Sequence, residues 1–171
     1  MPRLYKAWNG PMPTTAAQAS VATANGVKTM LQLATPSTDP IEIHSWGFSF
    51  DVASAGIMTV ELLETDVAAT VTAHVAAGVQ PIHAGDPASK LTLGTSATGY
   101  TGTAEGSITA TRVFSARKLP IASVGSSGGL AYEYQFTPAE RPRISVSKFC
   151  RIRVTATTTT PTMLCWICWQ E

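Results

Sequence analysis

From Val27 onward, apolar residues recur at every second position, and this period of two constrains the fold more than any other feature of the sequence. The clearest stretch is residues 130–136, where Leu, Tyr, Tyr and Phe alternate with Ala, Glu and Gln. Successive side chains of a strand point to opposite faces, so this pattern is typical of a sheet with one buried face. The sequence therefore predicts β-strands rather than amphipathic helices.

Further strands are predicted along the chain. In the first, Val27, Thr29, Leu31 and Leu33 share one face, and Pro36 ends the strand. In the second, residues 41–50, the apolar phase changes from odd to even between Ile43 and Trp46, as a β-bulge causes. Other strands are expected within residues 58–63, 91–93, 108–114, 142–157 and 163–169.

Two segments need separate interpretation. Residues 163–169 are apolar on both faces, which predicts a central strand that is covered on both sides. Residues 65–78 fit a short helix or a strand equally well, because a capping residue and a closing glycine flank β-branched residues.

The expected fold class is all-β, an antiparallel two-sheet sandwich that is jelly-roll-like. Composition agrees, since only 13% of residues are charged and little Glu or Lys is left for surface helices. We expect a single β-sandwich domain over residues 27–171.

Residues 1–26 are predicted to form an extended N-terminal arm. Proline and glycine are frequent there and no period is visible. Leu4, Tyr5 and Trp8 are large apolar residues that a solvated tail does not need, so they are candidate interface residues. We expect deletion of residues 1–13 to leave the domain folded and to weaken assembly.

The charge balance excludes several classes of protein. Lys plus Arg number 12 and Asp plus Glu number 11, which gives a net charge of +1. This excludes a nucleic-acid neutraliser, an acidic tail and a disordered polyampholyte. Low charge also leaves little to keep isolated chains apart, which favours a homo-oligomer.

Basic residues concentrate in one short segment. Four arginines there share odd positions, so on a continuous strand they would form one stripe. Two interpretations stay open: a solvated sheet face, or a contact stripe for an acidic protein surface. Nucleic acid is less favoured, because stacking aromatic residues are few nearby. The candidate interface residues of this stripe are Arg141, Arg143, Arg151 and Arg153, with Lys148 between them.

No catalytic, cofactor-binding or metal-binding residues are predicted. Ser127 occupies the serine position of a G-x-S-x-G motif, but that chemistry needs a later acid and histidine, and no His follows His83. Cys165 and Cys168 form a C-x-x-C motif, yet three steps along a strand place them on opposite faces. His74 and His83 match no known ligand spacing, so we expect a protein that is not an enzyme and has no cofactor.

The sequence also bears on the compartment. No segment approaches the roughly 20 apolar residues of a membrane span, and the N-terminus lacks the pattern of a signal peptide. The three cysteines, Cys150, Cys165 and Cys168, are an odd, clustered set and not a disulfide framework. We expect the chain to fold in a cytoplasm, without a membrane partner.

Three groups of segments carry a resemblance to a known family. They are residues 60–65 with 68–73, residues 93–100 with 103–106, and residues 151–155 with 165–171. Across about residues 25–171 the sequence resembles small proteins encoded among the virion structural genes of tailed phages that infect actinobacteria. The resemblance implies a non-enzymatic virion component, a capsid decoration (cement) protein bound to the major-capsid lattice.

The leading hypothesis is therefore a bacteriophage capsid decoration protein, a homotrimer on the capsid exterior that is made in the host cytoplasm. The alternative is a tail or head-fibre domain that binds host surface glycan, with Tyr100 as its loop aromatic residue. A hydrolase is disfavoured by the missing histidine.

Overall fold

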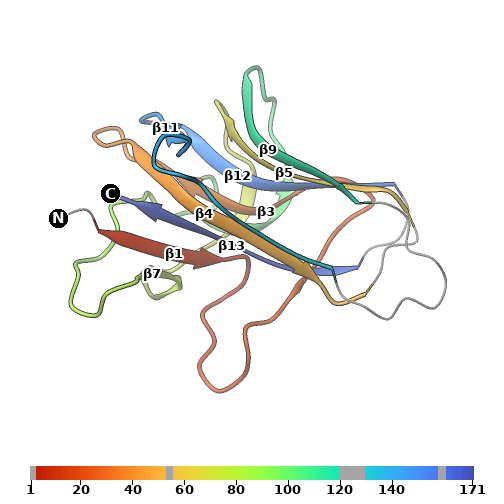
Figure 1. Ribbon diagram of the computed structural model, residues 1–171, viewed down its shortest axis with the longest axis horizontal. Coiled ribbons are helices and arrows are strands. Elements are labelled where there is room, and N and C mark those ends of the chain that lie inside the picture. The colour runs from red at the N-terminus through yellow and green to blue at the C-terminus, as the bar shows by residue number, and fades with distance from the viewer. Residues whose placement is uncertain (1–2, 53–55, 120–129, 158–160) are drawn as a thin grey trace.

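The computed structural model describes residues 3–52, 56–119, 130–157 and 161–171. It has two antiparallel sheets, one of seven strands and one of six, packed face to face as a sandwich (Figure 1). The all-β class and the two-sheet sandwich predicted from the sequence are confirmed.

The seven-stranded sheet is called sheet A and the six-stranded one sheet B. The order in sheet A is β10 (Ala131–Gln135), β4 (Ile41–Phe50), β13 (Thr162–Gln170), β1 (Leu4–Trp8) and β7 (Val79–Pro81), with β11 (Arg143–Ile144) beside β4 and β2 (Val21–Ala22) beside β13. The order in sheet B is β6 (Thr70–Ala73), β8 (Gly99–Ala104), β3 (Gly26–Ala34), β12 (Phe149–Ala156), β5 (Met58–Thr65) and β9 (Thr111–Leu119).

Helix is confined, in the part of the chain described, to one short 3-10 turn, η1 (Ala76–Gly78). Within those same ranges no helix has the length and apolar character needed to cross a membrane. The segment left open between helix and strand thus contains both strand β6 and the 3-10 turn.

Strands far apart in the sequence pair with one another. β1 pairs with β13, β3 with β12, and β4 with β10, whereas β5 pairs with the next long strand, β9. The two ends of the chain therefore lie together, with Leu4 opposite Gln170 (Figure 1). This pairing wraps the chain around one core rather than forming a series of local hairpins.

The core lies between the sheets and is filled by the inward-facing residues of both. Burial of each large apolar side chain contributes roughly 1.5–3 kcal/mol. The largest fully buried apolar residues include Trp46, Trp169, Tyr5, Met30, Leu31, Leu33, Ile41, Ile43, Met58, Leu62 and Leu63.

The β-bulge predicted in β4 is present. Cys168 of β13 pairs with Ser45 and the next residue, Trp169, pairs with Ile43, so His44 is the extra residue. The bulge changes the phase of the strand, and both Ile43 and Trp46 point into the core and are fully buried. The side chain of His44 is satisfied by a hydrogen bond of 2.9 Å with Gln170.

The single face predicted for β3 is wrong, because a second irregularity lies at Met30. Ile152 of β12 pairs with Leu31, while the next residue, Arg153, pairs with Thr29. Leu31 therefore faces the core, whereas Thr29 points to the outer side of sheet B and Val27 is 49% exposed. The change of phase is not visible in the sequence, because Val27 is apolar although it lies on the outer face.

The extended arm is wrong for Leu4–Trp8, which form strand β1 between β13 and β7. Tyr5 and Ala7 face the core and are 1% and 0% exposed. Both faces of this strand carry apolar residues, so the sequence shows no period, and its partner strand lies at the other end of the chain. The predicted central position of β13 is confirmed, although its outer face is only half-buried.

Candidate functional site

The outer face of sheet A carries two tryptophans side by side. Trp8 of β1 lies directly opposite Trp166 of β13, with ring centroids 6.2 Å apart and planes inclined by 56°. Both point outward because their neighbours Ala7, Cys165 and Ile167 fill the core. We call the group Lys6, Trp8, Leu164 and Trp166 the tryptophan face.

Lys6 lies over both indoles. Its Nζ is 3.9 Å from the ring centroid of Trp166 and 4.5 Å from that of Trp8. Such cation–π contacts contribute about 0.5–1 kcal/mol at exposed sites. No carboxylate in the described ranges forms an ion pair with Lys6, so its ammonium group is available to a partner.

Gly47 of β4 fixes the position of Trp166. A Cβ at this glycine would lie 2.9 Å from the Cε2, Cζ2 and Nε1 atoms of the indole. The absence of a side chain allows the ring to lie against the β4 backbone. Trp166 is therefore held by the glycine on one side and by Trp8 and Lys6 on the other.

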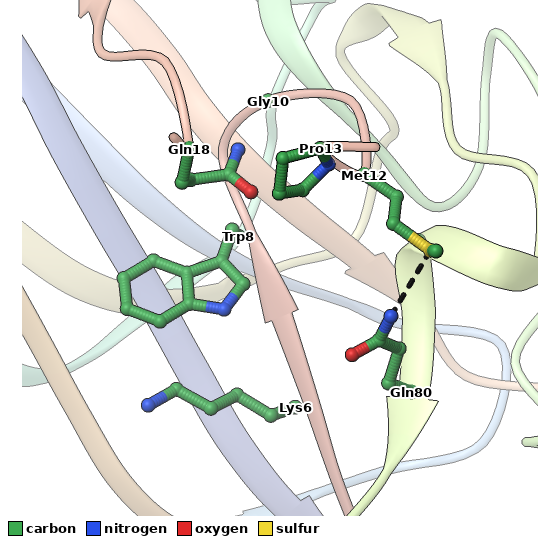
Figure 2. A pocket seen from close by; sticks show the side chains of 8 residues that line it. Lys6, Trp8, Gly10, Met12, Pro13, Gln18 and Gln80 are labelled. Atoms are coloured by element: carbon green, nitrogen blue, oxygen red, sulfur yellow. Dashed lines mark hydrogen bonds between the residues drawn. The ribbon is translucent and has the colours of Figure 1, made fainter. Parts of the chain in front are cut away.

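Two hollows flank Trp8. The first has a volume of about 230 Å³ and is shown in Figure 2, lined by Lys6, Trp8, Met12, Pro13, Gln18 and Gln80 among others. The second, of about 370 Å³, lies toward β10 and is lined by Trp8, Tyr132, Glu133, Leu164 and Trp166 among others. Trp8 thus forms a ridge between two depressions of the surface.

The first hollow offers polar groups beside the indole. Gln18 donates its amide N–H to the carbonyl of Pro11 at 3.2 Å. Gln80 donates to the sulfur of Met12 at 3.0 Å, as the dashed line in Figure 2 shows. Both amide oxygens have no hydrogen-bond partner among the residues that the structure describes. This leaves two acceptors and the Lys6 ammonium around an apolar wall.

The backbone of Trp8 is anchored by a buried histidine. His74 Nε2 lies 2.9 Å from the Trp8 carbonyl oxygen, and burial lowers the pKa of His74. A neutral imidazole that donates its N–H to this carbonyl fits both observations. His74 is therefore a satisfied structural residue.

The candidate interface residues near the N-terminus separate onto two faces. Leu4 and Trp8 point outward and are half-buried. Tyr5 points inward, stacks on Trp169 with centroids 5.9 Å apart and donates its hydroxyl to Pro87 O at 3.1 Å. Tyr5 is a core residue, and its assignment to an interface is wrong.

The predicted arginine stripe does not exist as one surface. Arg143 lies in β11 of sheet A, just after Arg141, whereas Arg151 and Arg153 belong to β12 of sheet B. Arg141 pairs with Glu42 at 3.2 Å and Arg153 with Glu61 at 2.9 Å. Of these four arginines, only Arg143 is exposed. The stripe is broken because turns separate strands that the odd-position pattern treats as one continuous strand.

Arg151 is fully buried on the outer side of sheet B. Its Nη1 donates to Glu105 Oε2 and to the Glu105 carbonyl, both at 3.2 Å, and its Nη2 donates to the carbonyl of Val67. Burial lowers the pKa of Arg151, and the nearby Glu105 raises it. Arg151 is thus part of the structure and not of a docking surface.

Of the motifs with possible chemistry, the structure describes the C-x-x-C motif but not the serine motif. Ser127 and its glycines lie outside the described residues. Cys165 and Cys168 point to opposite faces of β13, as predicted, and burial raises the pKa of both thiols. Over the ranges that the structure describes, no three His, Cys, Asp or Glu side chains gather where they could hold a metal ion.

Sequence reasoning identified Trp8 but missed Lys6, Gln18, Gln80 and Trp166. The alternation of β13 indicated that Trp166 faces away from Cys165, but only the pairing of β13 with β1 brings the two indoles together. Comparison of the chain with protein-family models, with curated proteins and with solved structures gave no match.

Proposed function

We propose that the protein is a non-enzymatic virion structural protein, a capsid decoration protein that docks on the major-capsid lattice through its tryptophan face. The observation that carries the proposal is the solvent-facing pair of Trp8 and Trp166, held in place by Lys6 and Gly47. Tryptophan is enriched among residues that dominate binding energy, and a fixed side chain loses little entropy when it binds.

The jelly-roll description of the sandwich is part of this proposal. Its support is the pairing of the long strands in chain order: β1 with β13, β3 with β12, β4 with β10, and β5 with β9. A strand hairpin rolled up in this way is typical of jelly rolls, which occur in viral capsid and lectin domains. This is an analogy at the level of the fold, and the function still depends on the site.

The proposal includes assembly and location. We propose a homotrimer on the capsid exterior, made in the host cytoplasm, with no cofactor and no nucleic-acid or membrane partner. The net charge of +1 on 171 residues supports a chain that works in contact with neighbours rather than alone.

A second candidate is a tail or head-fibre domain that binds host surface glycan. It is favoured by the hollow beside Trp8, where an indole adjoins the amide oxygens of Gln18 and Gln80, which accept no hydrogen bond from any described residue (Figure 2). Apolar walls with a few placed polar groups are typical of small-ligand sites.

Copy number in purified particles separates the two candidates. Hundreds of copies per particle support a shell protein, whereas a handful support a tail or fibre part. Particles stripped of the protein are then incubated with wild type, Trp8→Ala and Trp166→Ala. Each tryptophan variant should bind at least about thirtyfold more weakly, the equivalent of about 2 kcal/mol. Val146→Ala, at an exposed residue between β11 and β12 that lines neither hollow, should bind like wild type.

A further inference from the structure

On one side of the sandwich, each sheet ends in an edge strand, β9 in sheet B and β10 in sheet A. β9 pairs with β5 from Thr111 to Leu119 and with no other described strand, and β10 is the last strand of sheet A. The two edges lie close together, since the guanidinium of Arg117 in β9 is 4.5 Å from the ring centroid of Tyr132 in β10. An edge strand presents free backbone N–H and C=O groups that can pair with another chain.

A cleft of about 350 Å³ separates these edges. Four of its eight lining residues are aromatic, and two of these, Tyr134 and Phe136, pack edge-on with centroids 4.9 Å apart. We call it the edge cleft; it is lined by Phe114, Arg117, Tyr132, Tyr134, Phe136 and Glu140 among others.

Two observations in and beside the edge cleft indicate a missing polar partner. Arg117 and Lys118 form no ion pair with any described residue, whereas Arg112 of the same strand pairs with Glu64 at 2.8 Å. The hydroxyl of Tyr132 is buried and has no hydrogen-bond partner in the described part of the chain. Buried polar groups are nearly always paired, so this phenol calls for a group that the described part of the chain does not supply.

We infer that β9 binds an extended, acidic segment of a partner protein by strand addition. Arg117 lies opposite the core residue Val60, so its side chain is on the inner side of the strand, facing the cleft. A carboxylate of the added strand would pair with Arg117 in a charge-assisted hydrogen bond. An apolar side chain two positions away lies on the same face and enters the edge cleft, while main-chain pairing gives most of the affinity.

The charges of the site select this occupant over a second copy of the chain. The segment Thr111–Leu119 contains Arg112, Arg117 and Lys118 and no acidic residue. Two such strands paired edge to edge would bring basic residues close to one another, which destabilises the pairing. An acidic strand gains from the same residues.

Glu140 determines which part of the edge cleft can accept an acidic residue of the partner. Its carboxylate accepts hydrogen bonds from Thr137 at 3.0 Å and from Tyr134 at 3.4 Å. This negative group would repel a second carboxylate, so the acidic residue of the partner must lie beside Arg117 and the apolar one beside the aromatic wall.

The inference is tested by selection of a random ten-residue peptide display library on the full-length protein. We expect enrichment of peptides with Asp or Glu two positions from an apolar residue, and depletion of Lys and Arg. The best enriched peptide should bind at least tenfold more weakly to Arg117→Glu, and more weakly in high salt. Its binding should slow hydrogen exchange of the backbone amides within residues 113–117.

Arg143→Glu is the matched control, because Arg143 is an exposed arginine of the other sheet, and this variant should bind like wild type. Should Arg117→Glu fail to fold by circular dichroism, Lys118→Glu replaces it. No enrichment, enrichment of basic peptides, equal binding by the β9 variant, or binding of a ten-residue oligothymidine instead of acidic peptides overturns the inference. None of these outcomes depends on whether the tryptophan face docks on a capsid.

Discussion

Glu105 joins Arg151 to Thr29 across the outer side of sheet B. Its carboxylate lies 3.2 Å from Arg151 Nη1 and accepts hydrogen bonds from the backbone N–H and the hydroxyl of Thr29, at 2.6 and 2.7 Å. The side chain of Arg151 is 0% exposed and that of Glu105 is 23% exposed. The loop after β8 is thus held on the sheet by one carboxylate with three donors.

The first prediction concerns this pair. Glu105→Gln should lower the free energy of unfolding by about 3 kcal/mol, because it leaves the buried guanidinium without a counter-charge. Urea unfolding measures the loss. Glu133→Gln is the control, since Glu133 is exposed and a change there should stay within about 0.5 kcal/mol. Equal stability of the two variants would contradict a structural role for Glu105.

The second prediction concerns strand β1, a segment that the sequence alone predicts to be part of an extended arm. Tyr5→Ala should lower the free energy of unfolding by about 3–5 kcal/mol, because it removes a core aromatic ring stacked on Trp169. Deletion of residues 1–13 should lower it further, since β13 would lose a neighbouring strand. Thermal unfolding followed by circular dichroism measures both, with Val27→Ala as an exposed control. A deletion variant as stable as wild type would contradict the prediction and show that residues 1–13 are an arm that the fold does not need.

The sequence predicted those features that depend on neighbouring residues. The bulge at His44 is visible as a change of apolar phase within one strand. The bulge at Met30 is not, because Val27 is apolar and yet faces solvent. Local periodicity records which face a residue prefers only where one face is polar.

Features that depend on distant residues could not be predicted. Arg151 lies in an alternating strand that suggests an exposed stripe, but Val67 and Glu105 come from loops far away in the sequence and cover it. Trp8 and Trp166 likewise meet only because the first and last strands pair. Trp8 could be identified from the sequence as an interface candidate, whereas its contact with Trp166 could be found only from the strand pairing.

A third prediction follows from the buried thiols. Burial raises the pKa of Cys150, Cys165 and Cys168, and for Cys168 the nearby Lys6 and a hydrogen bond with Ser45 lower it in part. The thiolate is the reactive form, so a raised pKa means slow reaction at pH 8 and a faster one as the pH rises. A disulfide reagent should label Cys168 first and the other two only after unfolding. The Cys168→Ser variant should lack the early reaction, and rapid labelling of Cys165 in the native protein would contradict the prediction.

A fourth prediction concerns acid. Hydrogen bonds from the Thr109 hydroxyl and from the backbone N–H groups of Ala110 and Thr109 lower the pKa of Asp66 to about 2. Because the folded pKa lies below the unfolded value of about 3.9, the carboxylate stabilises the fold above about pH 4 and this contribution disappears as the pH falls toward 2. The urea midpoint of Asp66→Asn should therefore change less between pH 5 and pH 2 than that of wild type. Asp86→Asn is the control, because the Asp86 carboxylate has no hydrogen-bond partner in the described ranges, and its urea midpoint should change with pH as that of wild type does. A pH response of Asp66→Asn equal to that of wild type would contradict the assignment.

The last prediction tests how the tryptophan face is held. Gly47→Ala places a methyl group 2.9 Å from three atoms of the Trp166 indole, so the ring must move away from β4. Overpacking of this kind costs about 1–3 kcal/mol of stability. In the Trp166→Ala background the same methyl meets no ring, so the cost should fall by at least about 1 kcal/mol. Urea unfolding of wild type, both single variants and the double variant measures this coupling.

Binding to stripped particles should fall in Gly47→Ala as it should in Trp166→Ala, because the displaced indole no longer lies beside Trp8 and Lys6. Additive stability losses would show that the glycine does not position the ring, and particle binding like that of wild type would separate the indole position from docking.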